Sequence, residues 1–163
     1  MLEIEIIVGD EVSGILPVNS LRLETYARDI LARNGAASGE CNIVFIGDGF
    51  MTELNETYKG RTGTTDVLSF NLTDELSDGF CGEVYVSLNR AKAQAEEQGV
   101  PFDEEVVRLV THGLLHLAGH LHDTDDAYAS MTVKTDELVK AFFAQAPRIM
   151  HFIIRGPRKR GAR

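Results

Sequence analysis

The chain has 163 residues, a length that one domain of ordinary size accommodates. Hydrophobic residues make up 44% and charged residues 25% of it, proportions that exclude both a disordered chain and a membrane-embedded one. The net charge of −9 is unevenly distributed, because residues 138–163 carry seven cations and no acid. We predict one domain over residues 1–147 and a basic tail over residues 148–163, which either contacts an anionic partner or is simply solvated.

The N-terminal residues do not have the pattern of a secretory signal, because Glu3 and Glu5 interrupt their apolar run. No apolar stretch reaches the roughly 18 residues that span a bilayer. We therefore expect a cytoplasmic protein without a membrane partner. Cys41 and Cys81 are too few for a disulfide framework, and we expect both to be core thiols and not metal ligands.

The spacing of apolar residues predicts four strands and five helices. The strand patterns cover residues 2–8, 41–46, 67–70 and 84–86. The helix patterns cover residues 20–34, a short segment from 48, 88–98, 104–118 and a segment from about 124, with Tyr128, Met131, Leu138 and Phe142 at helical spacing. Ser20, Asp48 and Asp103 are expected to cap three of these helices, because each side chain can accept a hydrogen bond from a first-turn N–H group.

The predicted elements define the fold class. Polar residues 71–82 join the third and fourth strands without a helical pattern, which favours antiparallel pairing of these strands. The helix over residues 104–118 is apolar around most of its circumference, so it should be central and buried. We predict an α+β fold with a mixed four-stranded sheet packed with about five helices. The apolar residues 149–154 fit a strand, a docking segment or part of a tail equally well.

Four of the five histidines lie within residues 112–122. On a helix, His112 and His116 are one turn apart and can present their imidazoles to one metal ion. A turn at Gly119 would bring back His122 as the third ligand, and three imidazoles leave one tetrahedral position open, as in a catalytic zinc site. His120 is the alternative third ligand. We predict one zinc ion per chain, held by His112, His116 and His122 at the end of the buried helix.

The spacing His-x-x-x-His-x-x-Gly-x-x-His is also found in metzincin peptidases, which need a glutamate directly after the first histidine as general base. Gly113 occupies that position in this chain. A metallopeptidase-like hydrolase therefore lacks its proton acceptor and is the least favoured interpretation.

Three segments together resemble the YbeY family of bacterial ribosomal-RNA maturation endoribonucleases. The family signature His-Gly-x-Leu-His-Leu-x-Gly-Tyr-Asp-His is matched at His112, Gly113, Leu115, His116, Leu117, Gly119 and His122. Residues Thr65–Phe70 match the family strand Thr-Asp-Val-Leu-Ser-Phe, and Gly82–Ser87 is similar to the family strand Gly-Asp-Ile-x-Ile-Ser. The three segments occur in the family order within about residues 40–140.

Two positions depart from the family pattern. His120 and Leu121 replace Tyr-Asp, which removes a carboxylate that an aspartate within residues 123–126 could replace. Lys59 aligns with an arginine implicated in the family's activity, and lysine retains the charge but loses the bidentate fork for phosphate. Arg61 is the alternative phosphate-binding residue, and a solvated loop without a binding role is the remaining interpretation.

The resemblance implies a zinc-dependent, single-strand-specific endoribonuclease that acts in 16S rRNA maturation and ribosome quality control. Its implied partners are single-stranded RNA, rRNA, and the small ribosomal subunit with its assembly factors. We expect Lys59, Arg61 and His112 to be the catalytic residues. The acidic total argues against tight non-specific RNA binding, so binding would be local or assisted by a partner. The alternative is a non-catalytic ribosome-assembly module with a structural zinc, in which the fourth coordination position would be closed.

Overall fold

The computed structural model describes residues 1–120 and 123–145. In these ranges four strands form one sheet in the order β1-β2-β4-β3. The strands are β1 (Leu2–Val8), β2 (Gly39–Ile46), β3 (Val67–Asn71) and β4 (Phe80–Ser87). Strands β1, β2 and β4 are parallel, and β3 pairs antiparallel with β4. The predicted mixed four-stranded sheet and the antiparallel pairing of its last two strands are confirmed.

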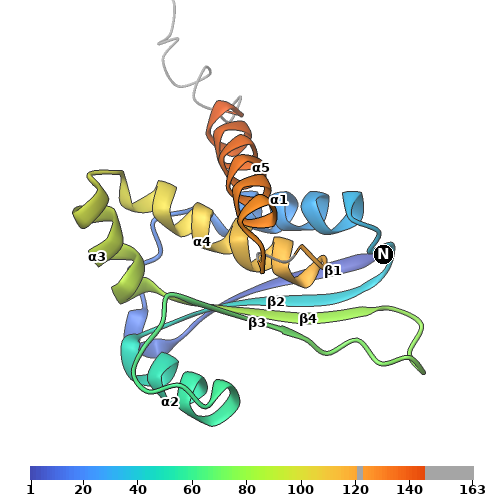
Figure 1. Cartoon of the computed structure of the whole chain (residues 1–163), viewed down its shortest axis with the longest axis horizontal. Helices are drawn as coiled ribbons and strands as arrows, with labels where there is room; N and C mark the ends of the chain where they lie inside the picture. The colour runs from blue at the N-terminus through green and yellow to red at the C-terminus, as the bar shows by residue number, and fades with distance from the viewer. Residues whose placement is uncertain (121–122, 146–163) are drawn as a thin grey trace, which may run out of the picture.

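Five α-helices and one short 3-10 helix, η1 (Asp10–Val12), accompany the sheet in the described ranges. The α-helices are α1 (Ser20–Arg33), α2 (Asp48–Lys59), α3 (Leu88–Gln98), α4 (Phe102–Leu117) and α5 (Asp125–Ala144). Figure 1 shows α1, α4 and α5 on one side of the sheet and α2 on the other. No helix in the described part of the chain is long and apolar enough to cross a membrane.

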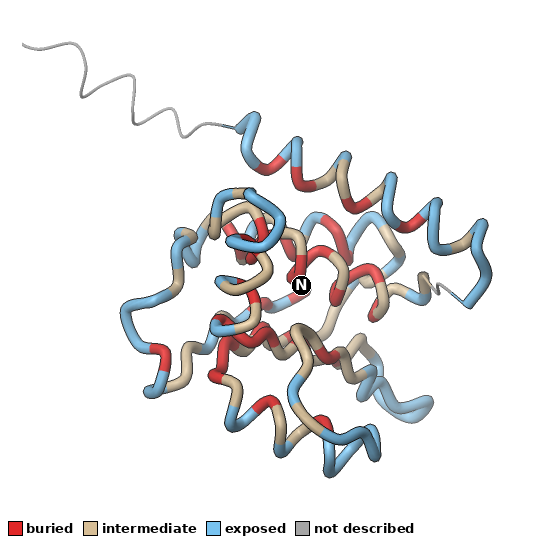
Figure 2. The backbone as a smooth tube through the Cα atoms, turned by 60° about the vertical axis from the view of Figure 1, so that its left-hand side comes forward, coloured by how far each residue is buried: buried red, intermediate tan, exposed pale blue. Residues whose placement is uncertain are grey.

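Helix α4 is the central helix of the fold. Figure 2 shows that the buried positions gather in the interior of the molecule, where its elements pack together. Ten of its 16 residues are buried, which accounts for the nearly continuous apolar pattern of its sequence. Gly113 sets its distance from the sheet, because a Cβ atom there would lie 2.5 Å from Val84 Cγ1 and 3.2 Å from Val67 Cγ2. Ser69 Oγ donates a hydrogen bond to the Gly113 carbonyl oxygen at 2.9 Å. Packing and hydrogen bonding thus fix α4 against β3 and β4.

The predicted caps of α1 and α2 are wrong. Asn19 caps α1, since its side chain accepts a hydrogen bond from the Arg22 N–H at 3.0 Å, and Ser20 is the first helical residue. Asp48 is the first residue of α2 and makes no cap bond. Its carboxylate accepts a hydrogen bond from Ser87 Oγ at 2.7 Å, so a contact with β4 replaces the local one.

The start of α4 also differs from the prediction. The helix begins at Phe102, after Pro101, which places Asp103 in the first turn and not at the cap. Helix α5 begins at Asp125, close to its predicted start, and Thr124 caps it, because its side chain accepts a hydrogen bond from the Ala127 N–H at 3.1 Å. Proline explains the earlier start of α4, since its fixed φ suits the residue that precedes a helix.

Tyr128, one of the four residues predicted at helical spacing in α5, is 59% exposed, whereas Met131 and Phe142 are buried. Cys41 is buried as expected, but Cys81 is only half-buried, with its Sγ atom 3.8 Å from Glu40 Oε1. Both cysteines are free thiols. The boundary predicted at residue 147, the tail over residues 148–163 and the apolar residues 149–154 lie outside the described residues.

Candidate metal centre

His112 and His116 occupy the last turns of α4, and both line a cavity next to β3. Both residues are half-buried. Their ring centroids are 4.7 Å apart, and their planes meet at 71°. The two rings lie close together because side chains four residues apart are on the same face of a helix. The two imidazoles are therefore close enough to share one ligand.

The third predicted ligand, His122, lies outside the described residues. Within residues 1–120 and 123–145, no group of three or more histidine, cysteine, aspartate or glutamate side chains could hold a metal ion. A three-histidine site on this chain therefore requires a ligand from residues 121–122 or 146–163.

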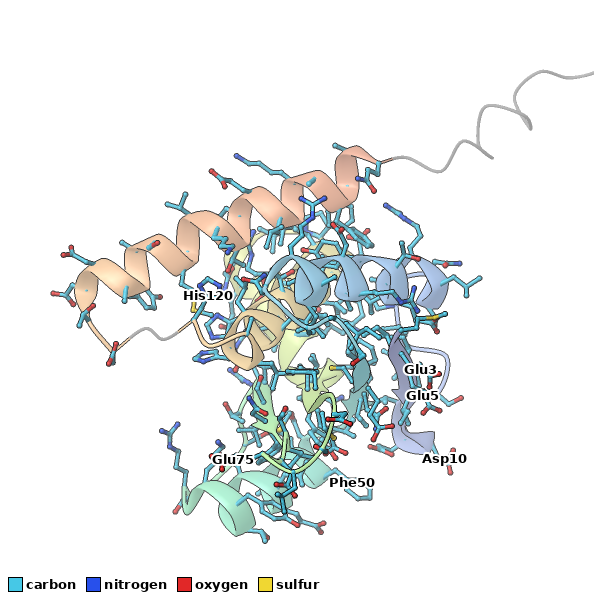
Figure 3. All side chains as sticks on the ribbon, turned by 90° about the vertical axis from the view of Figure 1, so that its right-hand side faces the viewer. Glu3, Glu5, Asp10, Phe50, Glu75 and His120 are labelled. Carbon is cyan, nitrogen blue, oxygen red and sulfur yellow. The ribbon has the colours of Figure 1, made fainter. Side chains whose placement is uncertain are left out.

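His120 is held in contacts with two other helices. Its Nε2 atom lies 2.9 Å from Asn34 Oδ1 at the end of α1 and 3.3 Å from Lys134 Nζ on α5. Figure 3 shows His120 beyond the end of α4, beside α5. Burial lowers the pKa of the His120 ring, and the positive charge of Lys134 lowers it further. Because His120 forms no three-residue metal group with His112 and His116 within the described residues, His122 is preferred as the third ligand.

A cavity of about 360 Å³ opens beside the histidine pair. Its walls come from the end of α4, from β3 and from the loop between α2 and β3. The charged and imidazole side chains that line it are Lys59, Arg61, Asp66, His112 and His116. The structure therefore brings four of the five predicted site residues together around one cavity, although they are up to 57 positions apart in the sequence.

Asn55 orders the loop that carries the two cations. Its side chain is 3% exposed, and its Nδ2 atom donates a hydrogen bond to the Gly63 carbonyl oxygen at 2.9 Å. Its backbone carbonyl accepts a hydrogen bond from the Arg61 N–H at 3.4 Å. Gly60 has φ +62°, a left-handed conformation that lets the chain leave α2 sharply after Lys59. These features fix the backbone that positions Lys59 and Arg61.

The two cations of this loop are held differently. Lys59 Nζ lies 5.1 Å from the ring centroid of Phe70, within the range of a cation–π interaction. Phe70 in turn packs edge-on against Tyr58 and Tyr85. Arg61 is exposed. Lys59 therefore has a defined aromatic support, whereas Arg61 can reach from the loop toward a ligand in the cavity.

Gly113 faces the sheet and not the cavity. The 2.5 Å approach of its virtual Cβ atom to Val84 Cγ1 shows that any side chain there would enter the core. A glutamate at this position could not act as the general base of a peptidase without displacing the sheet. The metallopeptidase interpretation is therefore disfavoured twice: this chain has no glutamate at position 113, and the structure has no room for one there.

Two acidic residues near the histidines were not predicted from the sequence. Asp66, at the start of β3, accepts hydrogen bonds from the Val67 N–H at 2.8 Å and from Gln94 Nε2 at 3.1 Å. Glu105, on α4, is 2% exposed, and its Oε2 atom has no hydrogen-bond partner. Burial raises the pKa of the Glu105 carboxyl, and the charge of Arg108 opposes that rise. Glu105 could have been noticed from its spacing of seven residues before His112, which puts both on one helical face.

A solved structure supports this architecture. The chain is similar to a Thermotoga maritima protein whose structure was determined in solution, with a TM-score of 0.60 and 25% identity over 100% of both chains. Fold and cavity together define a small α+β domain with a candidate metal centre at the end of its central helix.

Sequence comparisons give the family. A sequence model described as Endoribonuclease YbeY matches residues 15–143. The protein named Endoribonuclease YbeY in Flavobacterium psychrophilum is 34% identical over 140 residues, which cover 86% of this chain and 92% of that protein. The protein of the same name in Treponema denticola is 30% identical over 145 residues, which cover 85% of this chain and 92% of that protein. The chain belongs to the YbeY family, as the three sequence segments predict.

Proposed function

We propose that this chain is a zinc-dependent endoribonuclease that cleaves single-stranded RNA. The observation that carries the proposal is a cavity shared by a histidine pair from α4, Lys59 from the end of α2 and Arg61 from the α2–β3 loop. Imidazoles suit a metal ion, and cations suit the phosphates of RNA. The family name of the relatives, endoribonuclease, supports RNA as the substrate.

The donor set fits zinc. His112 and His116 present half-buried imidazoles at a mutual distance that one ion can bridge, and His122 would complete the set. When bound, zinc supplies a Lewis acid that can polarise a phosphoryl oxygen and lower the pKa of water. The cavity beside the histidines leaves room for a substrate, which supports a catalytic metal over the closed site of a structural one.

Lys59 and Arg61 are proposed to bind the phosphate of the bond that is cleaved. A phosphodiester gains negative charge on its oxygens in the transition state, so cations fixed beside it stabilise that state. Lys59 offers a point charge held over Phe70, and Arg61 offers a planar fork that can bind two phosphate oxygens. Asn55 supports both residues through the loop.

The shape of the site favours a single strand. The cavity lies between α4, β3 and the α2–β3 loop, so a backbone must leave a regular duplex to reach the histidines. We further propose that the substrate is rRNA and that the activity serves 16S rRNA maturation and ribosome quality control in the cytoplasm. The net charge of −9 supports a need for the small ribosomal subunit or its assembly factors to bring enzyme and RNA together.

Metal analysis and RNA cleavage in one preparation test the proposal. We expect about one equivalent of zinc per chain, cleavage of a labelled single strand but not of its duplex, loss of cleavage with a chelator and recovery with added zinc. Cleavage that persists after complete metal removal would contradict the zinc assignment. Bound zinc without cleavage, on naked RNA and on precursor small subunits alike, would instead favour the assembly module.

A further inference from the structure

A second cavity, of about 370 Å³, adjoins the cavity at the histidines. Asp66, Val67 and His112 line both cavities. The second cavity extends from these residues toward α3 and the first half of α4, which lie side by side in Figure 1. A ligand chain with one phosphate beside His112 can therefore continue into the second cavity without leaving the surface.

The two cavities differ in charge. The first has Lys59 and Arg61 against a single acid, Asp66, which suits a phosphate group. In the second, the acids Asp66, Glu97 and Glu105 outnumber the cations Arg90 and Arg108. Phosphate would be repelled there, whereas a neutral group with hydrogen-bond donors would be accepted.

Ion pairing further reduces the positive charge that the second cavity offers to a ligand. Arg108 pairs with Glu104 at 3.3 Å, with Glu105 at 3.9 Å and with Asp136. Three carboxylates thus share one guanidinium group, and little of its charge remains for a ligand. This arrangement strengthens the contrast with the exposed cations of the first cavity.

Glu105 supplies an acceptor that the protein does not use. Its Oε2 atom is buried without a hydrogen-bond partner, and the 3.9 Å to Arg108 Nε is too long for a hydrogen bond. A buried acceptor without a partner costs free energy, which a donor from a ligand would recover. Burial raises the pKa of this carboxyl, and donated hydrogen bonds would favour its charged form again.

We propose that the second cavity binds the base of a nucleotide next to the cleaved phosphodiester, and that the Glu105 carboxylate selects guanine. The Watson–Crick edge of guanine carries two adjacent donors, N1–H and the N2 amino group, which match the two oxygens of one carboxylate. Single-stranded RNA presents this edge to proteins. The cavity volume lies within the usual range of small-molecule sites, about 300–1,000 Å³. The inference rests on the proposed function, because it assigns a further part of the same substrate.

Binding of nucleoside 5′-monophosphates tests the proposal without any need for cleavage. We expect the full chain to bind GMP about 10-fold more tightly than IMP, which lacks the amino group, and than UMP. Glu105→Gln should remove this preference, because an amide replaces one acceptor oxygen with a donor. Equal affinity for the three nucleotides in the unmodified chain would overturn the base assignment, even if RNA is cleaved.

Glu104→Gln is the matched control. Glu104 also pairs with Arg108, but it does not line the second cavity. If Glu105 acted only through Arg108, both variants would change nucleotide binding alike, and the proposal would fail. If Glu105→Gln does not fold, Gln94→Ala is the second variant, since Gln94 lines the same cavity from α3 and should lower GMP affinity without touching the ion pairs.

Cleavage mapping separates this inference from the proposed function. In an oligouridine with a single guanosine, we expect cleavage to concentrate at a bond beside the guanosine by about 10-fold, and to become even along the strand in Glu105→Gln. Cleavage without positional preference would overturn the subsite while retaining the nuclease. Selective GMP binding without cleavage of any RNA would retain the guanine subsite and overturn the nuclease.

Discussion

The two walls of the candidate site are built in different ways. The α4 wall carries the histidine pair on a helix with ten buried residues, tied to β3 by the Ser69 hydrogen bond and by the close packing of Gly113. The opposite wall is the exposed end of α2 with the loop after it, which carry Lys59 and Arg61 and depend on Asn55 for their shape. One wall is rigid because the core requires it, and the other is ordered by a few hydrogen bonds.

This difference suits the two walls to different ligands, a metal ion on the α4 wall and a phosphate group on the loop wall. A metal ion requires ligands at fixed distances, so its donors belong on a helix whose position the core determines. Phosphate binding tolerates more adjustment, because long cationic side chains can follow a substrate. Four changes to the chain separate the two walls and then the parts that support them.

The largest effect is expected on the α4 wall. His112→Ala or His116→Ala should each abolish stoichiometric zinc, because two remaining ligands hold the ion far less tightly than three. Elemental analysis of the purified variants measures this directly. His120→Ala is the matched control, and it should retain zinc, since His120 forms no three-residue metal group with His112 and His116 within the described residues. A full equivalent of zinc in the His112→Ala, His116→Ala double variant would refute the assignment.

On the loop wall the expected effect is smaller and purely kinetic. Lys59→Ala and Arg61→Ala should each lower turnover, the more important of the two by about 10²-fold, while zinc content and folding stay unchanged. Lys59 has the aromatic support of Phe70, and Arg61 has the planar fork that can bind two phosphate oxygens. Equal turnover in the unmodified chain, both single variants and the double variant would mean that the loop is only a solvated surface.

The contrast between the walls also explains what the sequence predicts well. Helical periodicity in residues 104–118 requires His112 and His116 to be neighbours, and the structure has them so. Strand patterns and the polar connection over residues 71–82 likewise give the mixed sheet correctly. These features depend on local spacing, which the sequence contains.

Features that depend on distant residues were not predictable in the same way. Asp48 was expected to cap α2, but its carboxylate is bonded to Ser87, 39 positions away. The roles of Asn55 and Glu105 arise from burial, which only the packed structure defines. The place of His122 and the zinc ion itself remain predictions.

A third prediction tests the packing that supports the rigid wall. Gly113→Ala should destabilise the fold by about 1–3 kcal/mol, because its methyl group would overlap Val84 in the core. Gly49→Ala is the matched control, since Gly49 is also helical but a Cβ atom there has open space. That control should stabilise the fold by about 0.5–1 kcal/mol. Urea unfolding of both variants measures the difference, and equal stabilities would show that α4 does not depend on close contact with the sheet.

The smallest expected effect concerns residues 155–163, whose five cations lie outside both walls in the sequence. The rest of the chain is strongly acidic, so the two cations of the loop wall alone would attract RNA weakly over distance. Each phosphate that the tail neutralises should add about 0.7 to the slope of log affinity against log salt for a single strand. Deleting residues 155–163 should therefore make that slope shallower. Cleavage at saturating RNA should stay the same, because the histidines and the loop cations remain. Binding titrations at several salt concentrations measure the slope, and an unchanged slope would leave the loop wall as the main electrostatic contact with RNA.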